Sequence, residues 1–111
     1  MQPGSYPIYL HEQLEWHRKL TWKANDVVVQ LADYEATLRV RHPTEPGIYL
    51  ITLTKDDGIV LRDIAPNIEI TFTVDQVNGL DIPKTRYRLD LEPPGEPGFP
   101  LLKGDLIVER W

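Results

Sequence analysis

The sequence contains no cysteine, and its basic residues are fewer than its acidic ones. The absence of cysteine excludes disulfide frameworks, thiolate zinc sites and cysteine nucleophiles. The chain has 12 lysine and arginine residues against 17 aspartate and glutamate residues, which gives a formal net charge of −5. General binding to nucleic acid depends on basic residues that neutralise phosphates, so this balance argues against a nucleic-acid partner. A local row of basic residues is still compatible with this net charge.

Long apolar stretches are also absent. No run of about 18 apolar residues occurs, and residues 1–7 lack the charged segment and apolar run that begin a secretory signal peptide. We therefore expect neither a membrane span nor a signal peptide. The chain has 111 residues, of which 41% are hydrophobic and 26% charged, a composition that indicates one globular domain with one core.

The recognisable motifs of catalysis and metal binding are missing as well. The histidines His11, His17 and His42 are scattered along the chain, and none has a second ligand at a metal-binding spacing. No nucleophile elbow, phosphate-binding loop or EF-hand loop occurs. A domain this small also spends nearly all its inward side chains on its own core, so a small-molecule ligand is not expected. We expect no enzyme activity, no catalytic residue, no metal ion and no cofactor.

Two groups of carboxylates have an ordinary explanation. Asp56-Asp57-Gly58 superficially resembles part of a calcium-binding loop, but this composition is typical of a tight turn. Asp90 and Glu92 share one face of a predicted strand, where paired carboxylates are candidates for acid–base chemistry. On an acidic protein, exposure to solvent explains this pair better.

What the sequence has instead is a repeated alternation of apolar and polar residues, the period of a half-buried strand. The alternation predicts strands over residues 14–22, 36–40, 48–54, 59–61, 68–74, 87–91 and 101–111, with a short apolar continuation over 27–31. Residues 55–58 have turn chemistry and predict a hairpin. Thr73 or Asp75 is expected to cap a single helical turn that Gly79 ends. The proline-rich residues 93–100 are expected to lie outside the sheet.

Short strands separated by turns, without an amphipathic stretch of helical length, predict an all-β domain. We expect an immunoglobulin-like β-sandwich of about seven antiparallel strands with one short helical turn. Residues 1–13 are predicted to form an N-terminal arm or edge strand, and residues 14–111 the single sandwich domain.

The aromatic residues suggest two roles. Trp16 and Trp22 share the parity of Leu14 and Leu20, which predicts that both tryptophans are core residues. The alternative is that tryptophans and tyrosines form a platform for sugar rings, as in carbohydrate-binding modules. Large apolar side chains near the ends of the chain are instead candidates for an interface. These candidate interface residues are Tyr6, Ile8, Tyr9, Leu10 and Trp111.

The order of several motifs resembles that of the small immunoglobulin-like modules encoded among the tail, baseplate and fibre genes of tailed bacteriophages and prophages. Leu20-Thr21-Trp22 is followed by a polar turn, a short apolar segment and Tyr34-Glu35-Ala36 at the start of the next strand. A threonine-rich strand over residues 68–73 then leads into a short helical turn over residues 74–80.

The last part of the chain carries the most recognisable motifs of this resemblance. Residues 87–92 read Tyr-x-Leu-Asp-Leu-Glu, and residues 102–108 read Leu-x-Gly-x-Leu-x-Val. The resemblance covers residues 14–110. The loop over residues 93–100 is longer and richer in proline than is usual in the family, and residues 1–13 match no part of it.

The resemblance implies a structural protein of the virion tail that is assembled in the cytoplasm of the host bacterium. Its implied partners are other tail or baseplate proteins, and it is a possible homo-oligomer, because tails are built on three-fold and six-fold symmetry. No catalytic residue is implied. The alternative function is a receptor- or carbohydrate-binding β-sandwich module, and a small metal-dependent or hydrolytic enzyme is the least favoured.

Overall fold

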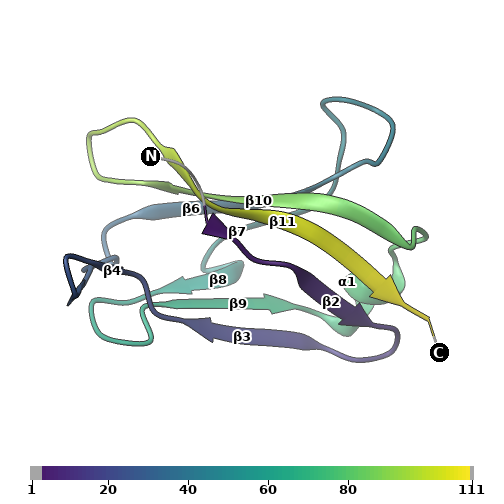
Figure 1. The fold of residues 1–111 in the computed structure, drawn as a ribbon, viewed down its shortest axis with the longest axis horizontal. Coiled ribbons are helices and arrows are strands. Elements are labelled where there is room, and N and C mark those ends of the chain that lie inside the picture. Colours follow the sequence, from purple (N-terminus) through teal and green to yellow (C-terminus); the bar gives the residue numbers. More distant parts are fainter. Residues whose placement is uncertain (1–3, 111) are drawn as a thin grey trace.

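The computed structural model describes residues 4–110, which form a β-sandwich of two packed layers (Figure 1). The elements are β1 (Gly4–Ser5), β2 (Ile8–His11), β3 (Trp16–Leu20), β4 (Lys23–Ala24), β5 (Val27–Val28), β6 (Glu35–Arg41), β7 (Tyr49–Lys55), β8 (Gly58–Leu61), β9 (Ile68–Phe72), α1 (Val74–Asn78), β10 (Lys84–Glu92) and β11 (Phe99–Glu109). A curled sheet runs in the order β1-β11-β10-β6-β7-β8-β9-β3, and β2 also pairs with β11. The predicted all-β, immunoglobulin-like sandwich is confirmed.

One layer of the sandwich contains β1, β2, β11, β10, β6 and β7, and the other contains β8, β9 and β3. The strands with the most regular alternation bury the side chains predicted to face inward. The buried residues of these strands are Ala36, Leu38 and Val40 in β6, Ile68, Ile70 and Phe72 in β9, and Tyr87, Leu89 and Leu91 in β10. Apolar burial between the two layers therefore determines which face of each strand turns inward.

The predicted helical turn is present as α1, and Thr73 is its N-cap. The Gln76 backbone N–H donates to Thr73 Oγ1 at 3.2 Å, and the Thr73 backbone N–H donates to Gln76 Oε1 at 2.9 Å. This reciprocal pair is a capping box, which satisfies backbone donors that a helix start leaves free. Gly79 caps the other end, as predicted.

The first predicted strand begins too early. Leu14 is 59% exposed and precedes β3, because the chain reverses direction there: the Leu14 N–H donates to the His11 carbonyl, and Gln13 has a φ of 70°. Trp22 follows the end of β3, and its backbone N–H donates to Asn67 Oδ1 at 2.8 Å. Residues 14–22 are thus a turn, a strand and a connection to β4.

The predicted hairpin between β7 and β8 is also wrong. The two strands share only a short parallel contact, at Thr54–Gly58 and Lys55–Ile59, and β8 then pairs with β9 in the second layer. Ile59 is fully buried and lies opposite Ile70 of β9. Tight-turn residues show that the chain bends, but not which strand it pairs with next.

One further boundary differs from expectation. Phe99 and Pro100, predicted to lie outside the sheet, are part of β11, and Pro100 sits opposite Asp90, where the register between β10 and β11 shifts. A bulge tolerates proline because the ladder is already interrupted there. The short strands β1 and β2 both pair in parallel with β11 at the edge of the sheet.

Candidate functional site

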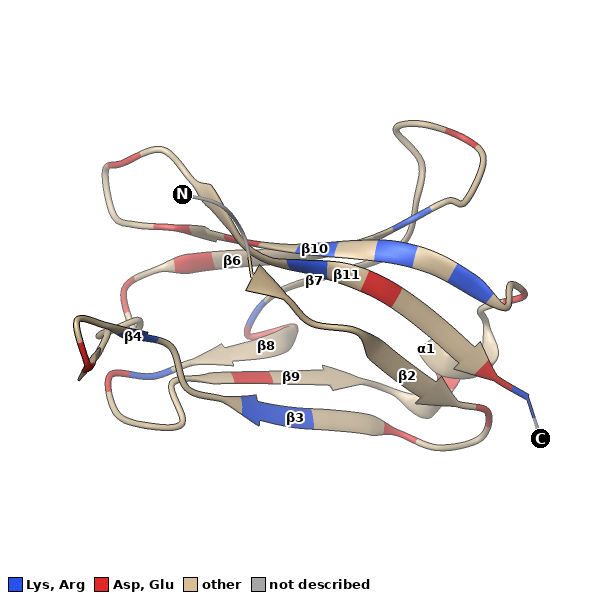
Figure 2. Ribbon diagram, viewed as in Figure 1, with Lys and Arg blue, Asp and Glu red and all other residues tan. Residues whose placement is uncertain are grey.

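A row of positive charge crosses the outer face of β6, β10 and β11. Arg39 of β6 lies directly opposite Arg88 of β10, and Arg88 lies directly opposite Lys103 of β11. Figure 2 shows the basic segments following one another along β10 beside a basic segment of β11. Like charges directly opposite each other destabilise a sheet. The stability of the isolated domain therefore does not explain this row.

Two more arginines extend the row along the same strands. Arg41 follows Val40 and Arg86 precedes Tyr87, the residue paired with Val40, and both arginines are exposed. We call the cationic residues Arg39, Arg41, Arg86, Arg88 and Lys103 the basic face. All five line a hollow of about 260 Å³ together with Tyr49 and Tyr87. The Arg39 guanidinium carbon lies 5.5 Å from the centre of the Tyr49 ring, within the range of a cation–π contact.

Only part of the basic face is neutralised within the domain. Asp90 Oδ1 lies 2.9 Å from Arg88 Nε, and Asp90 Oδ2 lies 3.5 Å from Arg39 Nη1. The side chains of Arg41, Arg86 and Lys103 form no ion pair with any residue in the described range 4–110. Three positive charges therefore remain available to a partner, on a protein whose net charge is −5.

The same face becomes acidic at its other end. Glu35 of β6 lies directly opposite Glu92 of β10, and both are exposed. A second hollow, of about 270 Å³, extends from these glutamates past Asp90 to Arg39 and Arg88. The outer surface of β6 and β10 thus has an acidic end and a basic end along the strand direction.

Two loops border this face at its ends and project beyond the sheet on the same side (Figure 1). Residues 93–98 connect β10 to β11 beside the acidic end, and residues 42–48 connect β6 to β7 beside the basic end. Ile48 and Tyr49, where the second loop enters β7, are 48% and 50% exposed. The charged face therefore lies between two borders that a partner would also contact.

The candidate interface residues near the start of the chain differ in how exposed they are. Ile8 and Leu10 of β2 are 1% and 0% exposed, so they pack in the core of their own domain. Tyr9, on the opposite parity of β2, is 48% exposed, and Tyr6 is half-buried against the core. Tyr9 and part of Tyr6 are therefore the surfaces that stay accessible. Trp111 lies outside the described residues.

Tyr6 also marks the point at which the N-terminal strands are attached to the domain. The buried hydroxyl of Tyr87 donates a hydrogen bond to the Tyr6 carbonyl, and burial raises the pKa of that hydroxyl. A Cβ at Gly104 would lie 2.5 Å from the same carbonyl oxygen. Tyr87 and Gly104 belong to the two most recognisable sequence motifs. Tyr87 binds the backbone at Tyr6, and Gly104 leaves room for that backbone beside β11.

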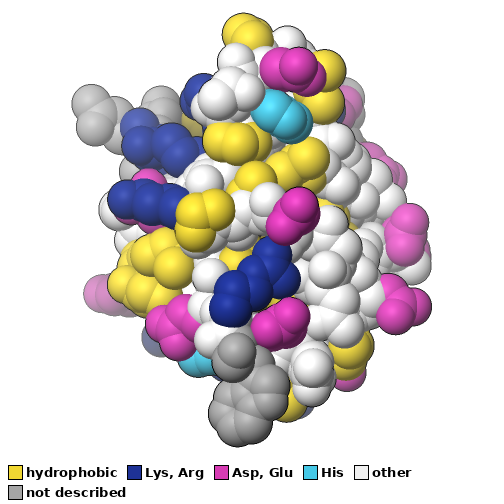
Figure 3. Space-filling view, turned by 90° about the vertical axis from the view of Figure 1, so that its right-hand side faces the viewer, with side chains coloured by type: hydrophobic (Ala, Val, Ile, Leu, Met, Phe, Trp, Pro, Cys, Tyr) yellow, Lys and Arg dark blue, Asp and Glu magenta, His cyan; other side chains and the backbone are white. Residues whose placement is uncertain are grey.

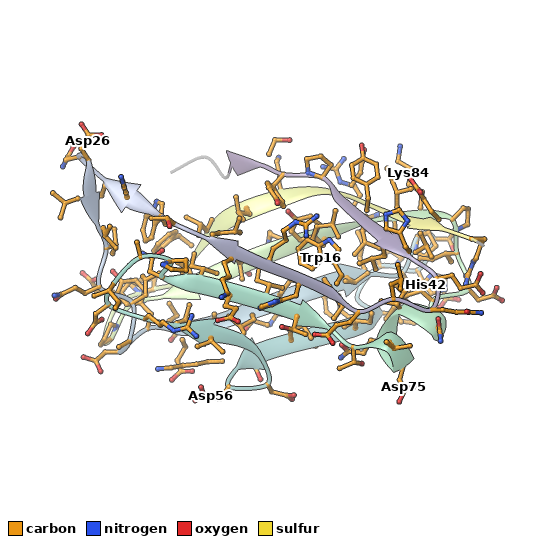
Figure 4. All side chains as sticks on the ribbon, turned by 90° about the horizontal axis from the view of Figure 1, so that it is seen from below. Trp16, Asp26, His42, Asp56, Asp75 and Lys84 are labelled. Carbon is orange, nitrogen blue, oxygen red and sulfur yellow. The ribbon has the colours of Figure 1, made fainter. Side chains whose placement is uncertain are left out.

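The tryptophans Trp16 and Trp22 do not form an exposed pair. Trp16 is 6% exposed and lies between the layers, with its ring centre 5.7 Å from that of Phe72 (Figure 4). Trp22 is half-buried and packs against Phe99 with the same separation of ring centres, 5.7 Å. A sugar ring has no access to the face of Trp16 in this conformation.

The histidines and acidic residues do not converge on a metal site within residues 4–110. His17 instead contacts Glu69, with 2.5 Å between His17 Nε2 and Glu69 Oε1. Arg62 Nη2 lies 2.6 Å from Glu69 Oε2, and the hydrogen bonds from Arg62 and then from His17 hold the pKa of Glu69 below its usual value. This cluster lies on the outer face of β9, in the layer opposite the basic face.

Exposed apolar side chains are scattered over several elements. They include Leu14, Val27 and Ile64, which are 59%, 67% and 72% exposed. Figure 3 shows hydrophobic groups interspersed with charged ones at one end of the molecule. Figure 4 places Asp26, at the tip of the β4–β5 ribbon, at the end opposite Lys84 and His42. Within residues 4–110, no helix has the length and hydropathy needed to cross a membrane.

Sequence reasoning did not identify the basic face. Its signal was present in the chain: Arg39 and Arg41, and likewise Arg86 and Arg88, are spaced by two at the end of one predicted strand and the start of another. That spacing predicts two basic residues on one face of each strand. The sequence does not show that these two strands are neighbours, so the combined charge was not apparent.

Comparison with known proteins shows little relation at the level of sequence. No protein-family model matches the chain, and no curated protein matches it. Among solved structures, extracellular domains 3–5 of Drosophila OTK are similar, with a TM-score of 0.42 and 18% identity, over 97% of this chain and 33% of that chain. The chain thus spans about a third of the length of that structure, and the fold assignment rests on its own strand order and pairing.

Proposed function

We propose that this protein is a non-enzymatic assembly module of a phage or prophage tail that binds a negatively charged protein surface through its basic face. The observation that carries the binding part is the row of Arg39, Arg88 and Lys103 directly opposite one another on adjacent strands. Such a row is unfavourable in the isolated domain and becomes favourable when an acidic surface covers it. The tail as the setting is supported by the motif order around residues 20–36 and 87–108.

A protein suits this face better than a nucleic acid does. Glu35, Asp90 and Glu92 lie on the same surface as the arginines, and they would repel a continuous phosphate backbone. A protein partner can instead match both signs of charge. Electrostatic complementarity of this kind gives specificity and orientation to a protein interface.

The proposal can be tested on tail particles purified from the phage or induced prophage that encodes the chain. Quantitative mass spectrometry should find the wild-type chain in these particles at a fixed ratio to other tail proteins. Arg86→Glu should reduce that ratio by about tenfold, because it replaces a cation of the basic face that has no ion pair among residues 4–110. Lys23→Glu is the matched control, since Lys23 is exposed on β4 and makes the same change of charge elsewhere.

Two results would contradict the proposal. Purified tails that lack the chain would exclude the tail as its location. A ratio that is the same for wild type, Arg86→Glu and Lys23→Glu would exclude the basic face as the docking surface.

A further inference from the structure

The charges on the outer face of β6 and β10 follow an order that is complementary to itself. Along β6 the outward residues are Glu35, Thr37, Arg39 and Arg41, and along β10 in the opposite direction they are Glu92, Asp90, Arg88 and Arg86. The strands pair so that Glu35 faces Glu92, Thr37 faces Asp90 and Arg39 faces Arg88. The two strands therefore present one shared gradient, from an acidic row to a basic row.

The midpoint of this gradient is the buried pair of Leu38 and Leu89. Rows at equal distances on either side of that pair carry opposite charge. The row of Glu35 and Glu92 corresponds to the row of Arg41 and Arg86, and the Asp90 row corresponds to the row of Arg39 and Arg88. A two-fold rotation about an axis that crosses the strands above Leu38 and Leu89 exchanges acidic and basic rows.

We infer that the partner of this face is the same face of a second copy of the chain, packed with its strands antiparallel. This inference rests on the proposed function and names the partner of its basic face. In such a dimer Glu35 and Glu92 of each copy oppose Arg41 and Arg86 of the other. The contact is isologous, as expected of a two-fold interface. Each row of repelling like charges then gains the opposite charge as its neighbour.

The size of the face sets the expected strength of the dimer. Seven residues along the strands span about 23 Å, and four strands side by side span about 19 Å. The resulting area, on the order of 400 Å² per copy, is at the small and transient end of specific interfaces. The loops over residues 42–48 and 93–98 project on the same side at the two ends of this area (Figure 1). We expect a weak dimer that forms at high protein concentration and dissociates when salt screens the charges.

The experiment is a charge-swap series followed by analytical ultracentrifugation over a concentration range that reaches millimolar protein at low ionic strength. The wild type should form dimers that dissociate on addition of salt. Arg41→Glu combined with Arg86→Glu makes both ends of the face acidic, and Glu35→Arg combined with Glu92→Arg makes both ends basic. Each double variant alone should dimerise at least about tenfold more weakly than wild type.

A mixture of the two double variants should restore dimerisation, because every acidic row then meets a basic row. Thermal melts establish that each variant is folded, and restored association in the mixture shows it independently. Lys23→Glu is the control variant, since its cation lies outside the face and its dimerisation should equal that of wild type.

Three outcomes would overturn the inference: a wild type that is monomeric throughout the range, a dimer that neither double variant weakens, or folded variants whose mixture does not associate. The proposed function is judged separately on tail particles. If particle content depends on Arg86 and not on Glu35 or Glu92, the basic face binds another acidic protein and only the dimer is wrong.

Discussion

On the outer face of β9, Glu69 has basic residues as its neighbours, whereas on the outer face of β6, β10 and β11 a row of cations is only partly matched by carboxylates. Glu69 contacts His17 at 2.5 Å and Arg62 at 2.6 Å, and Lys19 lies opposite it in the register. Arg88 lies between Arg39 and Lys103. The first arrangement pairs its carboxylate within the domain, whereas the second leaves Arg41, Arg86 and Lys103 without an ion pair among residues 4–110. This difference indicates which face the domain needs for its own stability and which is available for a partner.

The largest expected effect on the free energy of unfolding is at Asn67, which is fully buried just before β9. Its side chain donates to the carbonyls of Trp22 and Val29 at 3.0 and 2.9 Å and accepts from the Trp22 N–H at 2.8 Å. Asn67→Ala removes the partner of all three groups, and we expect it to lower the free energy of unfolding by about 3 kcal/mol. Chemical denaturation measures the loss. Gln30→Ala, at an exposed amide in the neighbouring loop, is the control and should have little effect.

A smaller loss is expected in the other layer, at the attachment of the N-terminal strands. Tyr87→Phe removes the hydroxyl that donates to the Tyr6 carbonyl and should cost about 1 to 2 kcal/mol of unfolding free energy. Tyr9→Phe removes an equivalent hydroxyl from a side chain that is 48% exposed and should cost almost nothing. Hydrogen exchange of β2 should be faster in Tyr87→Phe alone. Equal losses in both variants would show that the Tyr6 contact does not hold the strand.

The contribution of Glu69 to stability should depend on pH. The pKa of Glu69 is lowered below its usual 4.5 by hydrogen bonds from Arg62 and then His17, so the folded state favours the ionised carboxylate. The resulting stabilisation is present above pH 4.5 and is lost as pH falls through the lower folded value. Glu69→Gln should therefore be less stable than wild type at neutral pH, and the gap should close in strong acid. Denaturation curves measured across this pH range test the sign, and a gap that widens in acid would contradict it.

The smallest effects give the most direct comparison of the two faces. Replacing a cation by glutamine should change the free energy of unfolding in opposite directions on the two faces. Lys103→Gln removes a cation that lies opposite Arg88 and should raise the free energy of unfolding by about 0.2 to 0.5 kcal/mol. Arg62→Gln removes a cation that contacts Glu69 and should lower the free energy of unfolding by a similarly small amount. Both differences should shrink in high salt. Two losses of equal size would mean that the basic face contributes to the stability of the monomer.

Much of the fold could be predicted because it depends on local patterns. The alternation over Ile68, Ile70 and Phe72 identified β9 and its inward face correctly, and Thr73 was one of the two residues predicted to cap the helical turn. The incorrect predictions share one cause. Leu14 and the β7–β8 hairpin were assigned from neighbouring residues, whereas their positions depend on the turn after β2 and on the pairing of β8 with β9.

The sequence by itself determined the strand periods, the absence of cysteine and the alternate placement of arginines in two strands. Only the tertiary structure decided that β6, β10 and β11 are neighbours and that Arg39, Arg88 and Lys103 share one row. The physical reason is that side-chain alternation is a property of each strand, whereas register arises from contacts between segments that are distant in the chain. Charge on a sheet face is the sum of several strands, so it becomes visible only after those strands have paired.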